Sequence, residues 1–390
     1  MKSSRLILIL LFALLFAFSC SGGDDDDDND DNDVADDDIS DDDAADDDDN
    51  NDVADDDVTD DDDDDAPHPY TPCCDVNAET INMSDPGLPA DGNGPYQIFS
   101  IERTFIDAER DREIEANIIY PSTDGSSPAT DAAPFPLVVV SHGFSGTRAT
   151  VRQYGERLAT WGYIAIVPQL PYTNPFAILK LSHLESAKDI LFLLNTACCE
   201  HEQDGSDFFD LVDRARLATV GHSLGGKLST LAAVFDGGPR AVVGLDPVDG
   251  SGPIDFGDDN PDFPDVAPDN APNLLVPTLY LGGSESGIEV FGQACAPTEE
   301  NYHEFWTYSP PPSQEITFLG ADHTDFIIQL PGDICDVGTA DHVIVKQLAK
   351  EYMIAFLNVQ LRGWDRFEDD YAGAGIETDV QAGHVTWQAK

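Results

Sequence analysis

The stretch Gly221-His222-Ser223-Leu224-Gly225-Gly226 decides the fold, because it follows directly on the apolar run Leu217-Ala218-Thr219-Val220. A strand that ends in Gly-x-Ser-x-Gly and continues into a helix, here expected over residues 227–234, is the pattern of a nucleophile elbow. The serine of such an elbow occupies a strained turn, and side chains two residues to either side would collide with the neighbouring strand or helix. The sequence therefore predicts a serine nucleophile, Ser223, at the end of a sheet strand.

Apolar runs elsewhere alternate with helical patterns and predict an α/β fold. Two alternating stretches, 96–103 and 112–120, predict antiparallel strands, and the almost wholly apolar run 136–140 predicts a strand covered on both faces. Further helices are expected over 151–161, 183–195 and 340–361, and further strands over 163–168, 218–220, 241–245, 278–281 and 316–319. Strands alternating with helices imply a mostly parallel central sheet with helices on both faces, in one domain over residues 66–390.

Four histidines follow the elbow and are candidates for the base that a serine nucleophile needs: His303, His323, His342 and His384. In folds with this elbow, the acid and then the histidine follow the serine along the chain. His323 comes directly after the expected strand 316–319, and a loop at the carboxyl end of a strand is where such a base belongs. His342 falls in the last expected helix and His303 in an acidic, aromatic loop, so we predict His323 as the base.

Three carboxylates are candidates for the acid that orients this histidine. Asp246 ends the expected strand 241–245, Asp249 lies three residues later, and Glu285 follows the next strand. Pro247 stiffens the turn after Asp246, which helps to hold the carboxylate in one orientation. The residues alone therefore favour Asp246 and leave Glu285 and Asp249 open.

Two backbone amides are expected to bind the oxyanion that forms when a serine attacks a carbonyl. One belongs to Leu224, directly after the nucleophile. The other is expected in the loop after the strand 136–140, where Gly143 permits a close turn and Phe144 supplies the amide. His142 precedes the serine in the chain and His222 lies inside the elbow, so we expect both to be structural.

Residues 1–20 have the form of a bacterial lipoprotein signal. A charged start and an apolar run lead to Ala17-Phe18-Ser19-Cys20, which resembles a lipobox. We expect lipidation at Cys20 and a location in the bacterial cell envelope, at the outer membrane or cell surface because Ser21 follows the cysteine. An ordinary signal peptide, cleaved near Gly22 or Gly23, would give a secreted protein instead.

Residues 21–65 form an acidic linker. Between positions 24 and 65 the chain carries 28 aspartates and four asparagines, with no lysine, arginine or aromatic residue. Such a segment cannot bury enough apolar surface to offset the entropy of ordering, so we expect a disordered, self-repelling tether. The aspartate clusters could collect calcium, but they lack the spaced glycine and final glutamate of a defined calcium loop.

The net charge of −57 argues against nucleic acids as partners. With the tether aspartates and the two cations of the signal removed, about −31 remains for the folded part. A surface this acidic repels the phosphates of nucleic acids. We therefore expect no nucleic-acid partner. The other expectations are a small-molecule or lipid-like ester as substrate, a membrane contact through the N-terminal lipid anchor, and a monomer.

Six cysteines remain after Cys20, and an even number in an exported chain predicts disulfides. They are Cys73, Cys74, Cys198, Cys199, Cys295 and Cys335. Vicinal cysteines rarely bond each other, because the ring is strained. We therefore expect the pair 73–74 to join the pair 198–199, and Cys295 to join Cys335. A zinc site is the competing interpretation, and the spacing does not favour it.

Several stretches resemble the chlorophyllase branch of the α/β-hydrolases, which is related to cutinase-like and platelet-activating-factor-acetylhydrolase-like esterases. They are Pro136-Leu137-Val138-Val139-Val140-Ser141-His142-Gly143-Phe144, Val167-Pro168-Gln169-Leu170, Gly221-His222-Ser223-Leu224-Gly225-Gly226-Lys227, Gly244-Leu245-Asp246-Pro247-Val248-Asp249-Gly250, and Cys295-Ala296-Pro297-Thr298 with His303-Glu304-Phe305. The resemblance extends over roughly residues 96–362. It implies that the aspartate of the Asp-Pro-Val element, Asp246, is the acid. One position departs from the family, whose elbow usually has arginine where this chain has Leu224.

Motifs and resemblance together predict a serine carboxylic-ester hydrolase that forms an acyl-enzyme on Ser223 and needs no metal or organic cofactor. The substrate pocket is expected under residues 170–181 and 252–273, whose apolar side chains either suit an apolar acyl or alcohol group or simply pack the loops. Within enzymes, the alternative is a cutinase-like, lipase-like or platelet-activating-factor-acetylhydrolase-like esterase. From another class, the alternative is a non-catalytic or calcium-collecting surface lipoprotein.

Overall fold

The computed structural model describes residues 70–75, 83–250, 260–329 and 333–390. The expected signal, the lipidation site Cys20 and the acidic linker therefore lie outside the described residues. Within the described ranges, none of the helices has the length and apolar character that crossing a membrane requires.

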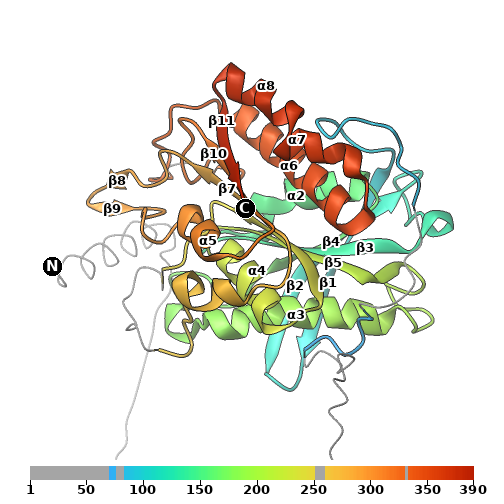
Figure 1. The fold of residues 1–390 in the computed structure, drawn as a ribbon. Helices are drawn as coiled ribbons and strands as arrows, with labels where there is room; N and C mark the ends of the chain where they lie inside the picture. The colour runs from blue at the N-terminus through green and yellow to red at the C-terminus, as the bar shows by residue number, and fades with distance from the viewer. Residues whose placement is uncertain (1–69, 76–82, 251–259, 330–332) are drawn as a thin grey trace, which may run out of the picture. The chain divides into compact units, whose positions relative to one another are not determined.

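A nine-stranded sheet forms the centre of the domain, in the order β1-β2-β4-β3-β5-β6-β7-β10-β11 (Figure 1). From β4 to β10 in this order the neighbouring strands are parallel, while β1–β2, β2–β4 and β10–β11 are antiparallel pairs. The prediction of a mostly parallel sheet is therefore confirmed. The strands are β1 Gln97–Asp107, β2 Arg112–Ser122, β3 Phe135–Ser141, β4 Ile164–Gln169, β5 Val212–His222, β6 Pro239–Leu245, β7 Thr278–Gly283, β10 Ser313–Phe318 and β11 Val385–Ala389, with a separate hairpin of β8 Glu289–Val290 and β9 Gln293–Ala294.

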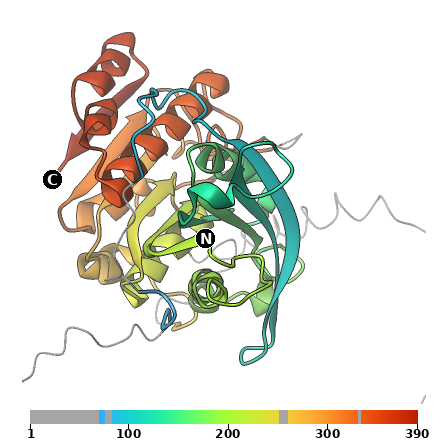
Figure 2. The ribbon, with the colours of Figure 1, turned by 90° about the vertical axis from the view of Figure 1, so that its right-hand side faces the viewer.

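Helices cover both faces of this sheet and enclose two apolar cores. One core contains side chains of α2 and α6, and the other contains side chains of α3 and α4. Figure 2 shows the red C-terminal helices and the light green helix α3 on opposite sides of the sheet. The helices are α2 Arg148–Thr160, α3 His183–Glu200, α4 Leu224–Phe235, α5 Tyr302–Tyr308, α6 His342–Arg362, α7 Glu368–Ala372 and α8 Ala374–Ala382.

Local signals in the sequence set the ends of several elements. All of β3 is buried, as an apolar strand covered on both faces must be. The side chain of Ser182 accepts a hydrogen bond from the Glu185 amide at the start of α3. Asp341 caps α6 in a similar way by accepting from the Val343 amide, and α6 is followed directly by Gly363, whose φ of 66° suits glycine.

Two parts of the fold differ from the sequence expectations. His303 lies in the short helix α5 and not in a loop, because Asn301 caps the helix start by accepting from the His303 amide. The chain also does not finish with α6, since α7, α8 and the edge strand β11 follow it. Elements this short have weak periodicity, and β11 depends on pairing with β10, which lies about 70 residues earlier.

The six described cysteines form three disulfides: Cys73–Cys199, Cys74–Cys198 and Cys295–Cys335. The expected joining of the two vicinal pairs and of Cys295 to Cys335 is confirmed, and the structure adds the connectivity within the vicinal pairs. The first two join the described segment 70–75 to the end of α3. Cross-links that close long loops stabilise a fold largely by restricting the unfolded chain. Disulfides of this kind are typical of exported proteins.

A partly buried carboxyl group on α6 should make stability depend on pH. Burial, together with the nearby charges of Asp379, Asp91 and Asp370, raises the pKa of Glu351 to about 7 from an ordinary 4.5. Between these two values the folded chain keeps a proton that the unfolded chain has lost. The contribution of this group to stability is therefore full below pH 4.5 and falls as the pH rises toward 7.

Glu351→Gln should accordingly raise the free energy of unfolding by roughly 1–2 kcal/mol at pH 8 and change it little at pH 4.5. Urea unfolding at both pH values measures the difference. Glu113→Gln, which alters an exposed glutamate of β2, is the matched control and should be neutral at both. An equal effect of Glu351→Gln at the two pH values would contradict the assigned protonation.

Candidate active site

The serine of the elbow lies on the tight turn between β5 and α4. Ser223 has φ 56° and ψ −125°, a backbone conformation that is costly for a residue with a side chain and occurs at functional turns. Its amide donates to the Leu245 carbonyl at 3.1 Å, and its carbonyl accepts from the Gly226 amide at 2.9 Å. The turn is thus held between the end of β6 and the first turn of α4.

The glycines around Ser223 are required by close backbone contacts. A Cβ at Gly221 would overlap the backbone of Gly225, and a Cβ at Gly225 would overlap the carbonyl of Ser141. Gly143 also approaches the nucleophile, since a Cβ there would lie 2.8 Å from the Cβ of Ser223. The glycine requirement inferred from the motif therefore has a direct steric cause, and the loop after β3 lies against the elbow.

Asp246 and His323 are in direct contact. Asp246 follows β6, and its Oδ2 lies 2.6 Å from Nδ1 of His323 in the loop after β10. The other carboxylate oxygen accepts from the Gly283 amide at 3.1 Å. Asp246 is fully buried and His323 is 7% exposed. A carboxylate that accepts from Nδ1–H leaves Nε2 of the imidazole free to take a proton, which is what a general base requires.

The loop that carries His323 is organised by the neighbouring Asp322. One carboxylate oxygen of Asp322 accepts from the Thr324 amide at 2.8 Å, and the other accepts from the Val337 and Gly338 amides at 2.6 Å each. These bonds join the loop to the segment before α6. Asp322 is not among the residues predicted from the sequence, although an aspartate that bonds the amide two residues later is a common turn pattern.

A second histidine packs against His323. Nε2 of His222 donates to the carbonyl of His323 at 2.8 Å, and the two rings lie 4.6 Å apart. Burial, with the adjacent imidazole of His323, holds the pKa of His222 well below its usual value. His222 therefore stays neutral and supports the loop of His323, which agrees with the structural role expected for it.

His142 braces the loop that carries the second expected oxyanion donor. Its Nδ1 donates to the Gly143 carbonyl at 2.8 Å, and its Nε2 accepts from the Leu170 amide at 3.1 Å. Burial lowers the pKa of His142 to about 4, so the ring stays neutral and keeps this pattern. Among the described residues, the amides of Phe144 and Leu224 have no hydrogen-bond acceptor, and Leu224 is the first residue of α4, where helix amides lack partners.

The other two acid candidates take part in different interactions. Asp249 forms a 3.1 Å ion pair with the buried Lys227 of α4, and Glu285 accepts from the hydroxyl of Thr339 at 3.1 Å. In the described part of the chain, Asp246 is the one of the three that contacts the candidate base. Lys227 is not among the residues predicted from the sequence, where its signal is a single lysine within an apolar helix.

The remaining histidines after the elbow have other partners. Nδ1 of His303 lies 2.8 Å from Glu315, and Nδ1 of His342 lies 3.2 Å from Asp325. The carbonyl of His384 accepts from a backbone amide after β10. These contacts leave His323 as the histidine that the structure places against Asp246.

One segment expected to line the substrate pocket lies beside the oxyanion loop. The Ser145 amide donates to the Thr173 carbonyl at 2.7 Å, which joins this loop to residues 170–181. Phe176 and Leu179 in this segment are 81% and 85% exposed, so neither packs the loop. In the second expected segment Phe263 is buried, and positions 252–259 lie outside the described residues.

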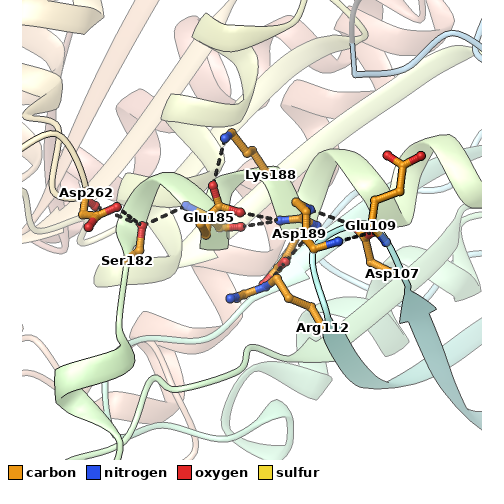
Figure 3. Close-up of polar contacts among 9 residues, drawn as sticks. Asp107, Glu109, Arg112, Ser182, Glu185, Lys188, Asp189 and Asp262 are labelled. Atoms are coloured by element: carbon orange, nitrogen blue, oxygen red, sulfur yellow. Dashed lines mark hydrogen bonds and ion pairs between the residues drawn. The ribbon is translucent and has the colours of Figure 1, made fainter. Parts of the chain in front are cut away.

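Polar contacts join the first turns of α3 to the β1–β2 turn and to residue 262 of the second segment (Figure 3). Nε of Arg112, on β2, lies 2.6 Å from the buried carboxylate of Asp189, and Arg110 lies 3.0 Å from the same group. At the helix start, the hydroxyl of Ser182 donates to the Asp262 carboxylate at 3.1 Å. Ion pairs therefore hold the β1–β2 turn to α3, and a hydrogen bond from Ser182 holds the second expected segment to the start of the same helix.

Comparison with known proteins gives related sequences across this region. A family model described as Chlorophyllase matches residues 117–371. The chloroplastic chlorophyllase-1 proteins of Citrus unshiu and Citrus sinensis are each 24% identical over 256 residues, which is 60% of this chain and 74% of the relative. A putative carboxymethylenebutenolidase of Methylorubrum extorquens is 26% identical over 199 residues, 48% of this chain and 66% of the relative. Cutinase 2 of Thermobifida cellulosilytica is 33% identical over 89 residues, 23% of this chain and 30% of the relative.

Proposed function

Because the chain belongs to the chlorophyllase family, we propose that it is a serine carboxylic-ester hydrolase that works through Ser223, His323 and Asp246. The relatives support the broader class, a hydrolase of the esterase type. The observation that carries the specific proposal is the buried 2.6 Å contact between Asp246 and His323. Both residues follow parallel strands at the carboxyl edge of the sheet, where β5 ends at the elbow.

In the proposed first step, the Oγ of Ser223 attacks the ester carbonyl while Nε2 of His323 takes its proton. Asp246 keeps Nδ1 protonated and stabilises the imidazolium that forms. The amides of Phe144 and Leu224 donate to the developing oxyanion, and such preorganised donors contribute about 2.7–4 kcal/mol each in related chemistry. The intermediate then collapses, the imidazolium gives its proton to the leaving alcohol, and the acyl group stays on Ser223.

In the proposed second step, His323 takes a proton from water, and the resulting hydroxide attacks the acyl-enzyme. The same two amides hold the second oxyanion. When this intermediate breaks down, the proton returns to Oγ of Ser223 and the carboxylic acid leaves. The net reaction consumes one water and releases one acid and one alcohol.

We propose an uncharged ester with an apolar acyl or alcohol group as the substrate class. The exposed side chains of Phe176 and Leu179, in a segment bonded to the oxyanion loop, support an apolar ligand. The net charge of about −31 on the folded part disfavours an anionic one. At Leu224, the buried first residue of α4, the chain lacks the charged arginine that the family elbow usually has, so chlorophyll is one candidate among several.

A fluorophosphonate probe tests the proposed chemistry before the substrate is known. We expect covalent labelling at Ser223, located by peptide mass mapping, and no labelling of that peptide after heat denaturation. A folded protein that leaves Ser223 unlabelled would support the alternative of a non-catalytic surface protein. Hydrolysis of chlorophyll, of short and long p-nitrophenyl esters, of phospholipid and of polyester film would then rank the substrates.

We also propose that the enzyme is exported and held in the bacterial cell envelope by a lipid on Cys20. The three disulfides support export, since such bonds persist in oxidising compartments. The anchor itself rests on the lipobox resemblance of the signal. An anchored location would bring an enzyme with an apolar substrate close to lipid-associated esters.

A further inference from the structure

A cavity lies near the amino ends of the parallel strands, whereas the candidate active site lies at their carboxyl ends. Its volume is about 320 Å³, and its lining comes from the first residues of β5 and β6 and the last turn of α6. This volume is at the small end of the range for small-molecule sites, roughly 300–1,000 Å³. Among the described residues, eight line the cavity, and three of them are arginines: Arg216, Arg240 and Arg362.

Three arginines in one cavity stand out in a chain with 76 acidic and 19 basic residues. Two of them, Arg216 and Arg240, lie where the pairing of the strands is irregular. The pairing of β5 with β3 skips residues 214–216, and its pairing with β6 skips residues 240 and 241. Such irregularities redirect side chains out of the regular ladder, and here they bring Arg216 and Arg240 to the end of α6.

These arginines differ in how their charge is balanced. Arg216 lies 3.6 Å from the carboxylate of Asp213, and both are buried. Arg240 is exposed and forms no ion pair with any residue in the described ranges. Arg362 is buried, and its Nε has no hydrogen-bond partner among the described residues. A buried cation without full compensation is costly, so the cavity favours an anion.

The guanidinium of Arg362 is held rigidly. Its two terminal nitrogens donate to the carbonyls of Trp161 and Gly162 at 2.8 and 2.7 Å, and it lies 4.2 Å from the ring centre of Tyr163 and 4.6 Å from that of Trp364. Burial and the charge of Arg216 lower the pKa of Arg362, the direction expected where cations gather. Fixed guanidinium groups match the geometry of phosphate-type oxyanions.

We propose that this cavity is a binding site for a small oxyanion of the phosphate type that carries two negative charges. The ligand is either free phosphate or the phosphate group of an organic phosphomonoester, and the recognition chemistry is the same. This site is separate from the candidate active site, so it can be tested by binding without measuring ester hydrolysis.

Calorimetric titration of the full chain with inorganic phosphate at pH 8, with chloride keeping the ionic strength constant, tests the proposal. We expect saturable binding to one site, weakened about tenfold by Arg240→Gln, because one charged hydrogen bond to the ligand is lost. Arg240 is exposed, so this variant should fold normally. Tighter binding of glycerol phosphate would identify a phosphomonoester ligand, and equal or weaker binding would identify free phosphate.

The matched control is Arg152→Gln, which alters an arginine of α2 that pairs only with Glu156 among the described residues and should bind phosphate like the unmodified chain. Equal affinities of Arg240→Gln and Arg152→Gln would overturn the proposal, as would no binding beyond that of chloride.

Discussion

Ser223→Ala should reduce the turnover of a soluble ester by about 10⁶-fold, because no other group near the elbow replaces the nucleophile. The effect should fall on catalysis and not on folding. Ser223 is partly exposed, and its backbone, rather than its hydroxyl, makes the bonds to Leu245 and Gly226 that hold the turn. Ester hydrolysis measured at saturating substrate, together with thermal unfolding, separates the two quantities.

Residual activity within about tenfold of the unmodified enzyme would contradict the assignment of Ser223 as nucleophile. Ser145→Ala is a suitable control, since Ser145 lies in the oxyanion loop and bonds Thr173 through its backbone amide. This variant keeps that amide and should retain most of the activity. Loss of activity in both variants with intact folding would point to a general disturbance of the loop.

Asp246→Asn should lower turnover by about 10⁴-fold. The buried carboxylate accepts from Nδ1–H of His323 at 2.6 Å, and an amide that donates there instead would favour the wrong tautomer. The amide oxygen can still accept from Gly283, so the strand end should keep its conformation. Turnover and its pH dependence measure the effect.

Glu285→Gln is the matched control for this prediction. Glu285 follows β7, and its carboxylate accepts from Thr339 while Nδ1 of His323 bonds Asp246, so its amide variant should keep nearly full activity. The reverse result, a large loss in Glu285→Gln and a small one in Asp246→Asn, would transfer the role of the acid to Glu285.

Much of the fold follows from patterns that are local in the sequence. The apolar run of β3 predicts a strand buried on both faces, and the whole of β3 is buried. The glycines of the elbow are predicted because the clashes they avoid lie within a few residues, as at Gly221 and Gly225. Short elements such as α5 and β11 were not predicted, because one or two turns of helix or a single edge strand carry little periodic signal.

The candidate site was predictable only in part. The sequence by itself determined the strand–serine–helix elbow, the histidine after β10 and the cysteines available for bonding, since each depends on neighbouring residues or on simple counting. The residues favoured Asp246 as the acid and the family resemblance implied it, but only the tertiary structure shows which candidate contacts His323. Asp246 and Asp249 follow β6 and Glu285 follows β7, so their contacts depend on how each loop folds. The tertiary structure also determines the pairing of Arg112 with Asp189 and the approach of three arginines near the amino ends of β5 and β6. These contacts join residues that are tens to more than a hundred positions apart, and only packing of the sheet and helices brings them together.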